Sequence, residues 1–93
     1  MEIISHEVEK LFDPTGILPG DRYEFLLNIE VPEDDELYSE NGLYIKLIYA
    51  VDDRGPRIAQ YQIFESITDT YLDFALDEEE EAAISDYCKQ FIE

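Results

Sequence analysis

Cysteine is almost absent from this chain: Cys88 is the single one among 93 residues. One thiol cannot form an internal disulfide, and it cannot supply a CxxC redox or zinc motif. The protein therefore needs no oxidising compartment, and we expect it to be cytoplasmic.

Basic residues are also scarce, with six Lys and Arg against 24 Asp and Glu, which gives a net charge of −18. Proteins that bind phosphate backbones or anionic lipid present basic patches, so this negative field would repel both kinds of ligand. We therefore expect no direct binding to nucleic acid and none to membranes. A basic protein surface would be attracted, and weak, non-specific binding of divalent cations is expected.

Long hydrophobic runs and an amino-terminal targeting pattern are missing as well. No stretch approaches the roughly 18 apolar residues of a spanning helix, and the amino terminus has no basic region followed by an apolar run. The chain does have 45% hydrophobic residues, including seven Tyr and five Phe, which is enough apolar surface for a folded core. Its length fits a single domain over residues 1–93.

Alternation of apolar and other residues predicts three clear strands. In residues 22–31 one face collects Tyr23, Phe25, Leu27, Ile29 and Val31. Residues 43–51 and 58–65 alternate in the same way. These three segments are expected to form the centre of a sheet.

Two weaker segments complete the expected sheet. Residues 6–12 are compatible with a first strand that carries Val8, and residues 70–75 can return as a fifth that carries Leu72 and Phe74 inward. Turns are expected before and between the clear strands, because Pro and Gly concentrate there.

The apolar period changes near the end of the chain. Spacings of three and four there predict one face of an amphipathic helix, formed by Ala83, Ile84, Tyr87, Cys88 and Phe91. Asp77 is placed as the N-cap of this helix, and Glu80 completes a capping box.

This order of elements predicts an α+β fold, an antiparallel meander sheet of about five strands with one C-terminal helix packed on one face. One helix cannot cover both faces. The second face, here called the open face, would carry Leu26, Tyr44, Ile48, Ile58 and Phe64. Monomers seldom leave such a patch unused. Three alternatives follow: the face pairs with a partner or a second copy, the sheet curls to hide part of the face, or the strand register differs from the expected one.

Two acidic stretches form a candidate acidic patch. Its members are Glu33, Asp34, Asp35, Glu36, Asp77, Glu78, Glu79, Glu80 and Glu81. A helix that begins at Asp77 explains part of the second stretch, because carboxylates oppose the partial positive charge of a helix N-terminus. Solvated charge is the favoured explanation for such a run, and a binding surface is the alternative.

The segments VEKLFDPTGILPGDRYEFLLNIEVPEDDELYS and QYQIFESITDTYLDFALDEEEE resemble a family of short, acidic, uncharacterised proteins of Gram-positive, Bacillus-type bacteria. The resemblance covers nearly the whole chain, and DPTGILPGDRYEFLL is its most specific part. It implies a bacterial cytoplasmic protein of unknown function, and it carries over no catalytic residue.

Catalytic and metal-binding motifs are not recognisable. Nucleophilic catalysis needs Ser or Cys held by a base, and the candidates are His6, Cys88 and scattered serines. We expect Cys88 to be a buried structural thiol and His6 a plain surface residue. A calcium loop fails because Ser39 or Asn41 stands where glycine is required. No catalytic residue, cofactor or specific metal site is therefore expected.

Three functions follow from these observations. The first is a small acidic protein-interaction module without catalytic activity, which binds a protein partner or forms a homodimer through the open face. The second is a nucleic-acid mimic that occupies the basic groove of a DNA- or RNA-binding protein, because residues 30–40 and 65–81 hold fourteen acids and no base. The third is a carboxylate-based or divalent-cation-dependent enzyme. The sequence favours the first.

Overall fold

A computed structural model describes residues 2–12, 20–35 and 38–92 of the protein. Within these residues, five strands and one helix follow one another along the chain. They are β1 (Glu2–Leu11), β2 (Asp21–Glu30), β3 (Leu43–Asp52), β4 (Gly55–Glu65), β5 (Tyr71–Leu72) and α1 (Glu78–Lys89).

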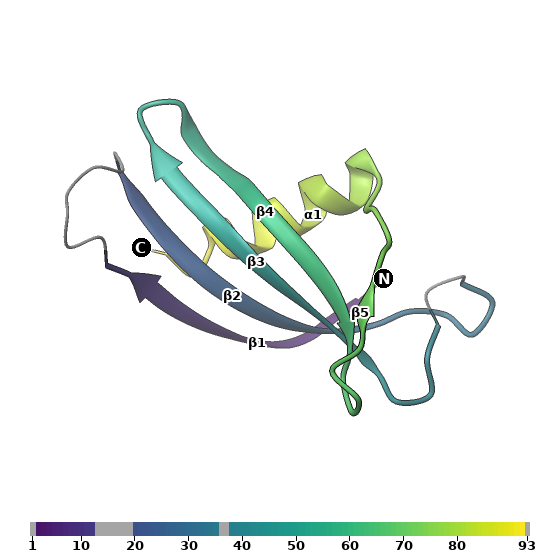
Figure 1. Ribbon diagram of the computed structural model, residues 1–93. Helices are drawn as coiled ribbons and strands as arrows, with labels where there is room; N and C mark the ends of the chain where they lie inside the picture. Colours follow the sequence, from purple (N-terminus) through teal and green to yellow (C-terminus); the bar gives the residue numbers. More distant parts are fainter. Residues whose placement is uncertain (1, 13–19, 36–37, 93) are drawn as a thin grey trace.

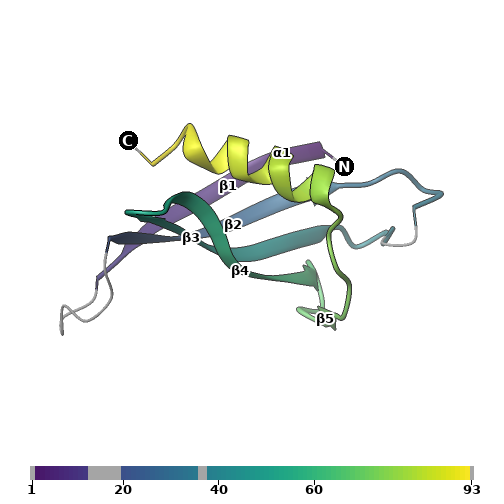
Figure 2. The same ribbon diagram turned by 90° about the horizontal axis from the view of Figure 1, so that it is seen from above.

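Each strand pairs antiparallel with the next one, so the sheet has the order β1-β2-β3-β4-β5. The helix α1 lies across one face of this sheet, which is clearest when the sheet is seen from its edge (Figures 1 and 2). The predicted α+β meander with one C-terminal helix is therefore confirmed. No helix among the described residues is long and apolar enough to cross a membrane.

The core lies between the sheet and the helix. Successive side chains of a strand point to opposite faces, so the apolar positions that alternation assigned to one face of β2 and β3 reach the helix side. The side chains from the strands that are at most 2% exposed on this side are Phe25, Leu27, Ile29, Leu43, Ile45, Leu47, Tyr49 and Ile63. They form one cluster with Ile84 and Cys88 of α1, which are completely buried.

The strand β1 begins earlier than the sequence suggested and packs against the C-terminal part of α1. His6 pairs with Leu27 and therefore lies on the helix side of the sheet. Its Nδ1 atom is 2.8 Å from the Tyr87 hydroxyl, and its ring centroid is 4.2 Å from that of Phe91. His6 is thus half-buried and is not the plain surface residue that we expected.

The strand β5 is shorter than the predicted segment of residues 70–75. The backbone N–H of Phe74 donates to the carbonyl of Leu72 at 2.9 Å, and this tight turn ends the strand. Leu72 packs against the core as predicted, whereas Phe74 remains 36% exposed. The prediction that Phe74 points inward was therefore wrong.

A β-bulge in β4 changes the faces of the sheet near its end. Ile48 pairs with Gln60, whereas the next residue, Tyr49, pairs with Ile58, so Ala59 is an extra residue in β4. Beyond the bulge the alternation is inverted. Ile58 consequently lies on the helix side with Tyr49 and packs against the core. Its predicted place on the open face was wrong, because strict alternation does not anticipate the extra residue.

Gly20 permits a close approach between two segments of backbone. Its φ is +76°, and a Cβ atom there would lie 2.2 Å from the carbonyl oxygen of Val51. Gly55 also has a positive φ, +97°, but a Cβ atom there would meet nothing within 4 Å. Gly20 is therefore required both by its positive φ and by the close approach of the Val51 backbone, whereas Gly55 is required by its positive φ alone.

We predict that Gly20→Ala lowers the free energy of unfolding by about 3 kcal/mol, because left-handed strain and a backbone clash add together. Gly55→Ala is the matched control and should cost about 1 kcal/mol, since only the strain applies. Urea unfolding followed by circular dichroism measures both values. Equal losses for the two variants would show that the contact with Val51 is unimportant.

Candidate interaction surfaces

The open face is arranged in rows, because residues that pair across neighbouring strands point to the same side. One row crosses all five strands and contains Ser5, Asn28, Tyr44, Phe64 and Tyr71. The Tyr44 and Phe64 rings stack with centroids 5.1 Å apart, and Phe64 meets Tyr71 edge-on at 5.9 Å. Each ring covers part of the next, so Tyr44 and Phe64 are half-buried.

The turn between β4 and β5 contributes a polar contact to this row. The Tyr44 hydroxyl donates a hydrogen bond to the Asp69 carboxylate at 2.8 Å. This bond raises the pKa of Tyr44, because it stabilises the protonated phenol, and burial acts in the same direction. Asp69 and Tyr71 are two residues of the open face that the sequence analysis did not select. The alternation within the predicted fifth strand, with Leu72 inward, could have indicated Tyr71.

The middle rows of the open face mix apolar and charged side chains. Leu26 lies beside Lys46, and Ile48 lies beside Glu24; both apolar side chains are half-buried. A shallow hollow of about 450 Å³ includes Leu26, Lys46, Glu24 and Glu7 in its lining. Lys46 makes no ion pair within the described part of the chain. This face therefore offers apolar surface together with charges of both signs.

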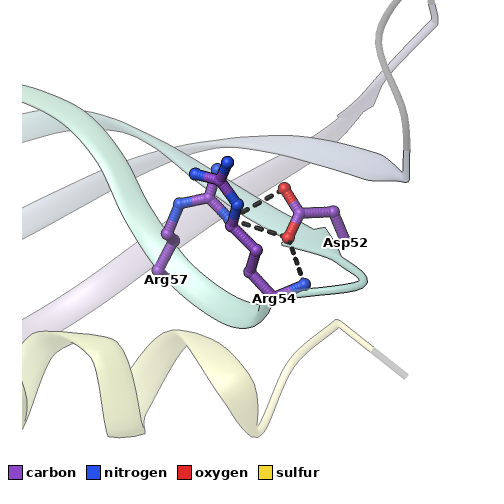
Figure 3. Close-up of polar contacts among 3 residues, drawn as sticks. All are labelled: Asp52, Arg54 and Arg57. Atoms are coloured by element: carbon purple, nitrogen blue, oxygen red, sulfur yellow. Dashed lines mark hydrogen bonds and ion pairs between the residues drawn. The ribbon is translucent and has the colours of Figure 1, made fainter.

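At the far end of the sheet, Asp52 holds the turn between β3 and β4 (Figure 3). Its two carboxylate oxygens accept hydrogen bonds from Nη1 of Arg57 at 2.8 and 2.7 Å, and the first also accepts from the backbone N–H of Arg54 at 2.9 Å. These bonds lower the pKa of Asp52, mainly through Arg57. Arg57 shares a row with Ala50 and Arg22, so two arginines belong to this end of the open face.

The structure thus brings four of the five predicted residues of the open face together, namely Leu26, Tyr44, Ile48 and Phe64. All four are half-buried by one another and by their neighbours, and no helix covers them in the described part of the chain. The sequence alone offered two main explanations for this apolar face, namely that it binds a partner or that the sheet curls to hide part of it. Mutual packing hides part of the apolar surface, and the remainder is accessible.

The second acidic stretch is partly used by the helix itself. Oδ1 of Asp77 accepts from the backbone N–H of Glu80 at 2.8 Å, and Oε1 of Glu80 accepts from the backbone N–H of Asp77 at 3.3 Å. The predicted capping box is therefore confirmed. Glu79 is exposed, whereas Glu78 and Glu81 line a groove beside β4. Two of the five acids thus have a structural role and two face a specific surface.

The first acidic stretch lies in the loop between β2 and β3. Glu33, Asp34 and Asp35 are exposed there, and Glu36 lies outside the described residues. In Figure 1 this loop projects beyond the end of the sheet, apart from the start of α1. The two acidic stretches therefore belong to separate surfaces.

A cluster around Glu65 joins the loop before β3 to the turn that carries Asp69. The Glu65 carboxylate accepts hydrogen bonds from the hydroxyls of Ser39 at 2.7 Å and Thr68 at 2.8 Å, and from the side-chain amide of Asn41 at 3.0 Å. These donors stabilise the charged form and lower the pKa of Glu65. The cluster fixes the end of the sheet from which Asp69 reaches Tyr44.

Two further features bear on chemistry, namely the thiol of Cys88 and the spacing of acidic groups in the described ranges. Cys88 is completely buried, and burial raises the pKa of its thiol to about 12, so the thiol stays protonated at neutral pH. Within the described ranges, no three His, Cys, Asp or Glu side chains converge in a way that could hold a metal ion.

We predict that Asp77→Ala lowers the free energy of unfolding by about 1 kcal/mol, because the helix loses its N-cap. Glu79→Ala removes an equal charge from the first turn without touching the capping box, and it should cost only a few tenths of a kcal/mol. Thermal unfolding of both variants measures the difference. Indistinguishable midpoints would contradict a structural role for Asp77.

A second prediction concerns acid stability. The pKa of Glu65 is lower in the folded state than in the unfolded chain, so its contribution to stability is complete above the unfolded value and disappears as pH falls through the folded value. Glu65→Gln should therefore lose stability at neutral pH and approach the wild type in acid. Urea unfolding over a pH series measures this, with Glu33→Gln in the exposed loop as the control. A difference that is independent of pH would contradict the prediction.

Comparison with known proteins places the chain in a family without assigning it an activity. No curated protein and no solved structure matched the chain. One family model matched it over residues 1–93, and that model describes a family of unknown function. This agrees with the resemblance to uncharacterised proteins, and it leaves the function to be inferred from the surfaces described above. The chain belongs to the family of unknown function DUF6509.

Proposed function

We propose that this protein is a small interaction module without catalytic activity, and that its open face binds another protein surface, in the first place a second copy of the chain. The observation that carries the proposal is the accessible, half-apolar face opposite α1. Apolar surface of this kind, bordered by polar groups, is typical of protein-binding sites.

Self-association is supported by the composition of the open face. A face that binds its own copy around a two-fold axis must offer both partners of every contact. Lys46 has no ion pair within the described residues, and Glu7 and Glu24 border the same hollow. Leu26 and Ile48 supply apolar surface beside them. The face therefore offers both charge signs and apolar surface, as a self-complementary interface requires.

The size of the face is also sufficient. Four strands of about ten residues cover roughly 600 Å² in each copy, from the rise per residue and the spacing of strands. Two such faces bury about 1,200 Å², which is at the lower end of the range for specific interfaces. The net charge of −18 on each copy opposes association, and salt screens that repulsion. We therefore expect a dimer that persists at high salt.

The cellular setting belongs to the same proposal. The resemblance to proteins of Bacillus-type bacteria supports a bacterial origin, and a single, buried thiol is consistent with the cytoplasm. The acidic net charge supports a protein partner in preference to direct contact with nucleic acid or a membrane surface.

The nucleic-acid mimic and the carboxylate-based enzyme are supported less well. A mimic needs a continuous array of carboxylates, whereas Asp77 and Glu80 are bound to each other's backbone in the capping box. An enzyme needs acids that converge in a pocket, whereas the acids that line the hollow of the open face share that lining with the base Lys46 and with Leu26.

We predict that Ile48→Lys weakens self-association by roughly 100-fold, because it places an unpaired charge in the centre of the buried face. Ile4→Lys is the matched control, since Ile4 is 61% exposed on β1 and lies away from the centre of that face. Light scattering of the wild type and of both variants, at low and high salt, gives the solution mass. The wild type and Ile4→Lys should be dimers, and Ile48→Lys a monomer.

Two outcomes would decide against self-association. A wild-type protein that is monomeric at high concentration and at every salt concentration would remove the second copy as the partner. A dimer that is unaffected by Ile48→Lys would show that the chain associates through another surface.

A further inference from the structure

A second surface lies beside the helix and is independent of the open face. A groove of about 610 Å³ separates the outer edge of β4 from the first turns of α1. Residues 56–61 form one wall, and Glu78, Glu81 and Ser85 belong to the other. Ser85 is held in place because its hydroxyl lies 3.1 Å from that of Tyr49.

The β4 wall of the groove is an unpaired strand edge. In the described structure β5 pairs only with Ile63 and Phe64, so β4 has no strand partner on its outer side from Gly55 to Gln62. Alternate residues of an antiparallel strand direct their backbone N–H and C=O groups outward. Such an edge is a template for an added strand. The bulge at Ala59 makes the regular part short, so side-chain contacts must supply much of the selectivity.

The helix wall supplies carboxylates that no basic side chain of the described residues pairs with. Glu78 and Glu81 make no ion pair there, and they take no part in the capping box of Asp77 and Glu80. The one basic side chain of the groove lining, Arg57, is already bound to Asp52. An occupant with positive charge toward α1 would therefore complement the groove, and an acidic one would be repelled.

We propose that this groove binds an extended, basic segment of another protein. The segment adds to the free edge of β4, and its lysine or arginine side chains on the helix side meet Glu78 and Glu81. In an extended chain every second side chain points to the same face. A segment with bases at alternate positions can therefore pair its backbone with β4 while all its bases face the carboxylates of α1. The proposal gives a binding role to Glu78 and Glu81, which take no part in capping the helix.

The proposal is tested with a defined probe, the acetylated and amidated peptide VKVKVKV, titrated into the full chain and followed by NMR. Binding should slow amide hydrogen exchange in residues 57–60 of β4, where the added strand covers the edge. The peptide VEVEVEV should not bind. Glu78→Gln with Glu81→Gln should weaken the binding of VKVKVKV by about fivefold, which corresponds to the loss of two exposed ion pairs.

The control variant combines Glu79→Gln with Glu33→Gln, which removes the same charge from outside the groove. It should change the affinity less than twofold, because only the long-range field is altered. Equal weakening in both double variants would overturn the proposal and leave only a general attraction to the acidic chain. Slowed exchange in β1 instead of β4, or no binding at about 1 mM peptide, would overturn it as well. None of these outcomes depends on whether the open face dimerises.

Discussion

The burial of one face of β2 and β3 beneath α1 is the constraint on which the rest of the structure depends. Each large apolar side chain in this contact contributes about 1.5–3 kcal/mol by leaving water. Since only one helix is present in the described chain, this burial can protect only one face of a five-stranded sheet. The apolar side chains of the opposite face are therefore shielded from water only by one another. Tyr44 and Phe64 stack, and Leu26 and Ile48 are half-buried.

The acidic side chains of the described residues lie outside the core between the sheet and α1. Among the described residues, the buried set contains no charged side chain, and the acids lie at the helix start, in the loop after β2, at the ends of the sheet and on its open face. Some of them are structural, because Asp77 caps α1, Asp52 holds the β3–β4 turn and Glu65 collects three donors. Individual carboxylates therefore stabilise turns and the helix start, while the net charge favours basic over acidic surfaces at long range.

The outer edges of β1 and β4 differ in how open they are to an added strand. β1 carries a bulge between Ile3 and Ser5 and several glutamates, which discourage an added strand. The edge of β4 also contains a bulge, yet it faces a groove whose other wall is α1. An extended segment at β4 would thus gain side-chain contacts with the helix in addition to backbone pairing. The open face and this groove are separate surfaces, so the two proposed interactions would not compete for the same residues.

Local periodicity in the sequence determined the strands, the helix, its capping box and the meander order, because each depends on residues that are close along the chain. It also placed Leu26, Tyr44, Ile48 and Phe64 together, since alternation holds through β2, β3 and the second half of β4. Only the tertiary structure decided the face of Ile58, because one extra residue at Ala59 inverts the pattern. It alone decided the burial of His6 against Tyr87 and the groove between β4 and α1, since these bring together residues far apart in the chain, whose packing leaves no periodic signal.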